Sequence, residues 1–102
     1  MDKEQNIPYR PLGILTDMIE GIGLQITHVY EDLLFVEHNA FLLRMEKKGE
    51  DVSVFFNVDS ETEKRPEIFS ILAETGSKDG FNFERKGCYR LDVDIVFLDD
   101  QM

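Results

Sequence analysis

The sequence predicts an α+β fold: a two-layer sandwich with an antiparallel sheet of five or six strands and two helices on one face. Two segments place apolar residues three and four positions apart, which is typical of helices buried on one side. Other short runs alternate apolar and polar side chains, as strands do. Short turns join the first strands and favour antiparallel pairing. The predicted order is helix, three or four strands, helix and two strands.

The length and composition indicate one globular domain over residues 1–102, with flexible ends at 1–10 and 99–102. Hydrophobic residues make up 42% of the chain. Its 21 acidic residues exceed its 11 basic ones, giving a net charge of -10. That charge repels phosphate backbones, so nucleic-acid binding is disfavoured and a basic protein partner is favoured. A nucleic-acid mimic that occupies a basic partner follows from the charge alone and is a weaker hypothesis.

The compartment is predicted to be the cytoplasm. Cys88 is the single cysteine, so no internal disulfide can form, and this favours a reducing compartment. The polar start of the chain does not resemble a secretory signal. The longest apolar runs have four residues, whereas a membrane span needs roughly 20.

The first helix is expected over residues 11–23. Pro11 suits its first position, and Gly21 and Gly23 favour its end. Its apolar stripe contains Leu12, Leu15, Ile19 and Ile22, widened by Ile14 and Met18.

From Leu24 the apolar period changes to two, which predicts strands at 24–30, 33–38, 40–46 and 52–58. The parity of the first strand places His28 on the inward side. Gly49 favours a hairpin between the strands at 40–46 and 52–58. These short connections predict an antiparallel meander.

A second helix is expected from Pro66 to Gly76, followed by a strand at 81–86 and a final strand at 88–98. Because side chains alternate along a strand, Asp92 and Asp94 are predicted to lie on its solvent side. The opposite side is predicted to face the core and contains Tyr89, Leu91, Val93, Ile95 and Phe97.

The same alternation predicts apolar residues on the outer face of the sheet. If Val54 and Phe56 face the helices, Phe55 faces outward. An apolar patch with a charged rim is typical of a protein–protein interface, although a fully covered sheet would bury it without a partner. The residues predicted to bind a partner are Phe55, Leu42, Val96, Leu98, Asp92 and Asp94.

No catalytic signature is recognised, and no enzyme activity or cofactor is expected. Nothing in the sequence places His28 or His38 beside Cys88 or a serine. The spacing of Asp92 and Asp94 does not match a calcium loop. An acidic ligand- or metal-binding domain built on these aspartates and the two histidines remains the alternative hypothesis.

The order of elements and the stretch "ILAETGSKDGFNFERKGCYRLDVDI", a helix, a glycine-containing loop and a closing hairpin, resemble the type III secretion chaperones. The resemblance covers residues 11–98. It implies a homodimer formed through the second helix or an edge strand, and an extended partner polypeptide along the outer sheet. Phe55, Leu42, Val96 and Leu98 would contact that partner, while Asp92 and Asp94 would select a basic one. The expected function is a non-enzymatic protein-binding module, a dimeric chaperone-like or adaptor domain.

Overall fold

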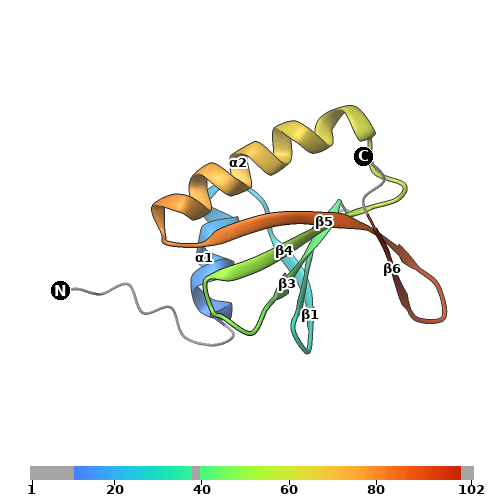
Figure 1. Cartoon of the computed structure of the whole chain (residues 1–102), viewed down its shortest axis with the longest axis horizontal. Coiled ribbons are helices and arrows are strands. Elements are labelled where there is room, and N and C mark those ends of the chain that lie inside the picture. Colours follow the sequence, from blue (N-terminus) through green and yellow to red (C-terminus); the bar gives the residue numbers. More distant parts are fainter. Residues whose placement is uncertain (1–10, 38–39, 100–102) are drawn as a thin grey trace.

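A computed structural model of the chain describes residues 11–37 and 40–99 (Figure 1). This part contains two α-helices, α1 (Leu12–Gly21) and α2 (Arg65–Lys78), a short 3-10 turn, η2 (Thr62–Lys64), and six strands. The strands are β1 (Ile26–Tyr30), β2 (Leu33–Val36), β3 (Phe41–Met45), β4 (Asp51–Asn57), β5 (Asn82–Leu91) and β6 (Ile95–Asp99). No helix in this described part combines the length and apolar character needed to cross a membrane.

The six strands form one curled, mixed sheet in sequence order, β1 to β6. All neighbouring pairs are antiparallel except β4 and β5, which are parallel. The prediction of a purely antiparallel sheet is therefore wrong. The parallel pairing of β4 and β5 results from the long connection over residues 58–81. This connection contains α2 and returns the chain to the end of the sheet at which β4 begins. Figure 1 shows α2 lying along β5 as this crossover helix.

The second helix runs beyond its predicted end at Gly76 and stops at Lys78. The left-handed glycine that follows the helix is Gly80, with φ of 88°. Gly76 serves packing, because a Cβ added there would lie 2.6 Å from two ring carbons of Phe83. The prediction that α2 ends at Gly76 is therefore wrong, because this glycine is required by the close contact between the helix and Phe83 and not by the end of the helix.

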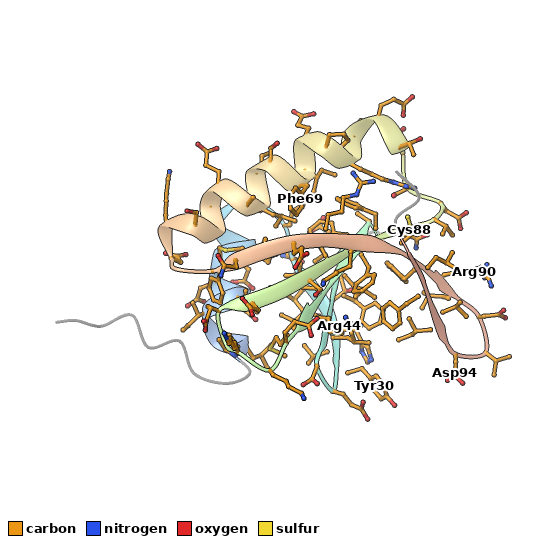
Figure 2. The ribbon with its side chains drawn as sticks, in the orientation of Figure 1. Tyr30, Arg44, Phe69, Cys88, Arg90 and Asp94 are labelled. Atoms are coloured by element: carbon orange, nitrogen blue, oxygen red, sulfur yellow. The ribbon has the colours of Figure 1, made fainter. Side chains whose placement is uncertain are left out.

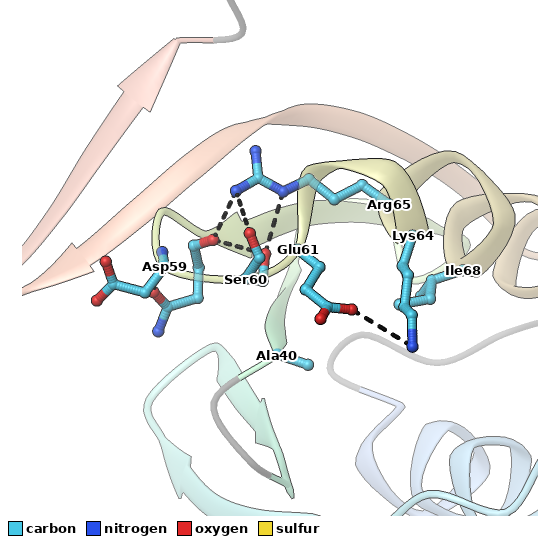
Figure 3. A pocket seen from close by; sticks show the side chains of 8 residues that line it. Ala40, Asp59, Ser60, Glu61, Lys64, Arg65 and Ile68 are labelled. Carbon is cyan, nitrogen blue, oxygen red and sulfur yellow. Dashed lines mark hydrogen bonds and ion pairs between the residues drawn. The ribbon is translucent and has the colours of Figure 1, made fainter.

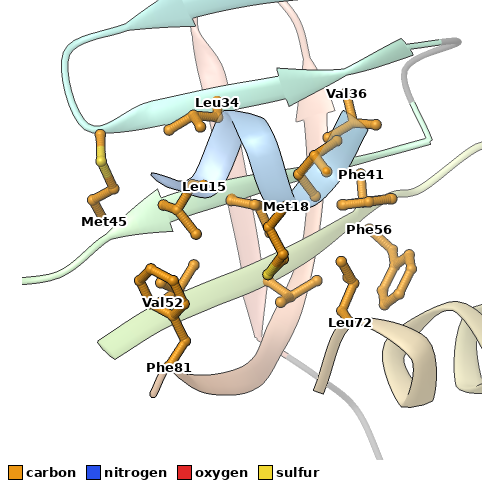
Figure 4. Packing of buried hydrophobic residues seen from close by; sticks show 13 residues of the cluster. Leu15, Met18, Leu34, Val36, Phe41, Met45, Val52, Phe56, Leu72 and Phe81 are labelled. Carbon is orange, nitrogen blue, oxygen red and sulfur yellow. The ribbon is translucent and has the colours of Figure 1, made fainter. Parts of the chain in front are cut away.

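The main core lies between the helices and one face of the sheet (Figure 4). α1 contributes Leu15, Met18 and Ile19, and α2 contributes Leu72. Strands β2, β3 and β4, and the residue just before β5, supply the rest of its buried residues: Leu34, Val36, Phe41, Leu43, Met45, Val52, Val54, Phe56 and Phe81. Only part of the predicted stripe of the first helix is buried, because Leu12 and Ile14 are 37% and 41% exposed, and α2 likewise leaves Ile71 exposed.

Two register shifts change which side chains reach this core. In β1 the shift lies between Ile26 and His28, and in β5 the pairing with β4 skips Lys86. A bulge of this kind inserts one residue and reverses the alternation beyond it. Phe83, before the β5 bulge, packs against the main core, whereas Tyr89, after it, belongs to a separate cluster.

That separate cluster, the inner cluster, fills the concave face of the sheet away from the helices. Its buried residues are Leu33, Phe35, Leu42, Phe55 and Tyr89, with Ile95 packed against them. The rings of Phe35 and Tyr89 meet edge to face with centroids 6.1 Å apart. The middle of the sheet is consequently covered on both faces, which matches the alternative of a fully covered sheet rather than an exposed outer face.

Candidate functional site

Phe55 and Leu42, two of the residues predicted to bind a partner, are buried. Phe55 is 4% exposed and Leu42 is 0% exposed. The ring centroids of Phe55 and Phe97 are 4.6 Å apart, and the guanidinium carbon of Arg44 lies 4.9 Å from the Phe55 centroid. Phe55 does point away from the helices, but the curl of the sheet places β6 over it. The predicted exposure of these two side chains is wrong.

The predicted final strand, residues 88–98, is divided by a turn that contains Asp92 and Asp94. Its first part continues β5, so the predicted break between residues 86 and 88 is wrong, and its second part is β6. The Asp92 N–H donates to the Asp94 carbonyl at 2.9 Å, and the Val93 N–H donates to Asp92 Oδ1 at 3.0 Å. Both aspartates are exposed, but at a hairpin tip rather than along a straight strand. Asp92 therefore has a local role in shaping this turn.

Val96 and Leu98 do not share a face with Phe55 and Leu42. Leu98 pairs with Cys88, whose thiol accepts a hydrogen bond at 3.4 Å from Arg65 in α2. Val96 and Leu98 alternate with Ile95 and Phe97 along β6, so they lie on the helix side of the sheet. The six residues predicted to form a single surface are therefore divided between the inner cluster, the hairpin tip and the helix side of β6.

The structure brings together a different set of residues, in a groove between the start of the sheet and the β5–β6 hairpin. We call it the hairpin groove. It consists of two adjoining hollows of about 270 Å³ and 550 Å³ that share Tyr30, Leu91 and Ile95. Figure 2 labels Tyr30 and Asp94, which lie on the same side of the molecule. The other lining residues are Thr27, His28, Glu31, Leu33, Phe35, Asp92, Val93, Asp94 and Phe97.

The bulge in β1 directs His28 and Tyr30 into this groove. After the bulge His28 pairs with Phe35, and Tyr30 pairs with Leu33, so both follow the concave face. The ring centroids of His28 and Phe35 are 5.8 Å apart. The predicted inward position of His28 beside Ile26 is wrong, because the sequence pattern assumed unbroken alternation. His38 lies outside the described residues.

The groove has an apolar floor and an acidic rim. Leu33, Leu91 and Ile95 provide aliphatic surface, and the aromatic Tyr30 is 53% exposed. Its carboxylates are Glu31, Asp92 and Asp94, and none of the described residues that line it is lysine or arginine. Val93 at the hairpin tip is 98% exposed. Exposed apolar groups beside acid are typical of a binding surface.

β6 borders this groove, and no other described strand pairs with its outer edge. Within the described residues it pairs only with β5. Its sequence "IVFL" contains no charged residue before Asp99, and Phe97 and Leu98 are exposed. Edge strands are usually protected by charges, proline or bulges, because their free N–H and C=O groups can pair with another chain. The opposite edge, β1, has a bulge, whereas β6 has no such protection in its pairing with β5.

A second pocket, near the start of α2, has a structural explanation (Figure 3). It measures about 440 Å³ and is bordered by Arg65, which is only 7% exposed. The Arg65 guanidinium donates to the carbonyls of Asn57, Val58 and Ser60 at 3.0–3.3 Å. These bonds attach the start of α2 to the end of β4, so the cation is already engaged.

Two groups have shifted pKa values. Burial tends to raise the pKa of Glu46, but hydrogen bonds from Ser53 and Arg44 outweigh it, and the pKa falls below its usual 4.5. Burial raises the pKa of Tyr89, against a weak hydrogen bond from Asn57. Neither group lines the hairpin groove, and both shifts follow from local packing rather than from a reactive arrangement.

Among the described residues, no group of three or more His, Cys, Asp or Glu side chains is arranged to hold a metal ion. The geometry of these residues therefore gives no support to a metal site built on Asp92, Asp94 and His28. Comparisons with protein-family models, curated proteins and solved structures found no match to this chain.

Proposed function

We propose that this protein is a non-enzymatic protein-binding module that receives an extended segment of a partner at the free edge of β6. The observation that carries the proposal is the strand itself: it is apolar, partly exposed, without charge over residues 95–98, and paired on one side only among the described residues. Such an edge offers a row of N–H and C=O groups to an incoming strand.

Strand addition at this edge would also use the hairpin groove. Side chains of an added strand alternate, so one row would face the groove beside Ile95 and Phe97. The other row would lie on the helix side, beside Val96 and Leu98. Main-chain hydrogen bonds would supply affinity, and the alternate side chains would supply specificity. The site thus differs from the predicted one, because Phe55 and Leu42 lie beneath it.

A chaperone-like or adaptor role is part of the proposal. A domain that holds another protein's segment in extended form keeps that segment from folding or from pairing elsewhere. The support for this role is physical: an open edge, a neighbouring apolar groove and a net charge of -10 that opposes non-specific self-association.

The test is selection of random linear peptides against the folded protein, followed by amide hydrogen exchange with and without a selected peptide. We expect protection of β6 amides. Leu98→Lys, which adds a protective charge to the edge, should abolish binding. Ile71→Lys, a matched change of an exposed apolar residue on α2, should leave binding intact. Protection confined to other elements, or equal loss in both variants, would refute the proposal.

A further inference from the structure

Resting on the proposed function, we infer that the partner segment is basic, with lysine or arginine in the row that faces the hairpin groove and apolar residues in the row that faces Val96 and Leu98. The groove-facing stems would lie along Leu33, Leu91 and Ile95, while the charged ends reach the rim. Long basic side chains commonly divide themselves in this way, with the aliphatic part buried and the cation near water.

The charge distribution supports a basic occupant. Glu31, Asp92 and Asp94 line the larger hollow, and no described lining residue is basic. The whole chain has 21 acidic residues against 11 basic ones. A basic segment would be attracted from a distance, whereas an acidic one would be repelled.

The side chain of Arg44 shows that the concave side of the sheet can hold a cation between aromatic rings and a carboxylate. Its guanidinium lies 4.9 Å from the Phe55 ring centroid and 5.6 Å from that of Phe97, and its Nε lies 2.8 Å from a Glu46 oxygen. A cation held between aromatic rings and a carboxylate is thus already present on the concave side. Tyr30 and Asp94 offer the same pair of groups in the groove.

A second copy of this chain fits the same edge less well. Asp94 precedes residues 95–98 and Asp99 follows them. Antiparallel pairing of two β6 strands would bring Asp94 of one copy toward Asp99 of the other at both ends. Like charges opposite each other destabilise such pairs.

The experiment uses three synthetic peptides of equal length in which valine alternates with lysine, glutamine or glutamate. Binding is measured by fluorescence anisotropy at low and high salt, and the site is located by hydrogen exchange. We expect the lysine peptide to protect β6 and to bind about tenfold more tightly than the glutamine peptide at low salt, with the gap closing in salt. The glutamate peptide should bind more weakly still.

A matched pair of variants tests the residues. Asp92→Asn with Asp94→Asn should remove most of the preference for lysine, and an asparagine oxygen can still accept the Val93 N–H that shapes the turn. Asp17→Asn with Glu74→Gln changes the net charge equally, at exposed helix positions, and should keep the preference.

Three outcomes would overturn the inference, and each has a different meaning. Equal binding of the lysine and glutamine peptides, with β6 protected, removes the basic preference and leaves the proposed function intact. Failure of every peptide to protect β6 removes the proposed function and the inference together. Protection of β6 that grows with protein concentration, with a dimer in light scattering, assigns the edge to a second copy.

Discussion

Replacing Phe55 with alanine tests whether the concave face of the sheet is a second core. Phe55 is 4% exposed and contacts the Phe97 ring at 4.6 Å. A buried Phe→Ala change costs about 3–5 kcal/mol. We expect about 3 kcal/mol, the lower end, because Phe97 and Arg44 lie near the surface and can partly close the gap. With a urea m value of about 1.5 kcal/mol/M, the unfolding midpoint falls by about 2 M.

The matched control is Phe56→Ala. Phe56 is the next residue, is 0% exposed and belongs to the main core under the helices, so its loss should cost about 4 kcal/mol. A double-mutant cycle of Phe55 and Phe97 should give a coupling of about 1 kcal/mol. If Phe55→Ala costs less than about 1 kcal/mol while Phe56→Ala costs its full amount, the concave face is open and the curled sheet is wrong.

Two further predictions concern polar groups. The pKa of Glu46 is lowered in the folded protein, so its contribution to the free energy of unfolding is present above pH 4.5 and is lost as the pH falls through the lower folded pKa. Glu46→Gln should therefore destabilise the protein at neutral pH and match the wild type in acid, as measured by urea unfolding at several pH values. A constant difference at all pH values would contradict this. Arg65→Lys should cost about 2–3 kcal/mol in the same assay, because one ammonium nitrogen cannot replace the three guanidinium nitrogens, which donate to Ser60 Oγ, to Cys88 Sγ and to the three carbonyls. An unchanged midpoint would show that those bonds contribute nothing.

Local features of this fold could be predicted from the sequence. The helix over Leu12–Gly21 lies within the predicted range, since Leu15, Met18 and Ile19 recur at helical spacing and are buried. The alternation along residues 52–58 correctly placed Val54 and Phe56 against the helices. The spacing of apolar residues in a helix or strand is a local property of the sequence, so it can be recognised without knowledge of the tertiary structure.

The errors have a different origin, in features that depend on distant partners. Gly87, beside Lys86, is compatible with a bulge but equally with a turn between two strands, so the sequence does not show that Phe83 and Tyr89 reach opposite faces. The bulge is defined by pairing with β4. The parallel pairing of β4 and β5 likewise depends on where the crossover returns the chain. The turn at Asp92 had a local signal, since aspartate favours turns, but the surrounding alternation masked it.

The hairpin groove could not be assembled from the sequence for the same reason. Tyr30 and Leu91 lie far apart in the chain and meet only because the sheet curls. Of the residues predicted to bind a partner, Asp92 and Asp94 line the groove, and Val96 and Leu98 lie on the strand that borders it. Phe55 and Leu42 were placed on the correct side of a sheet whose curvature then covered them.

The parallel crossover has a consequence for synthesis of the chain on the ribosome. Domains are made from the N-terminus at about 5–20 residues per second, so β1 to β4 leave the ribosome and can pair through short turns before β5 has emerged. Leu42 and Phe55 then remain uncovered until the crossover is complete and Phe97 has left the exit tunnel. Before that point, the nascent strands β1 to β4 expose an apolar concave surface. Association with other chains can compete with folding until the β5–β6 hairpin covers this surface.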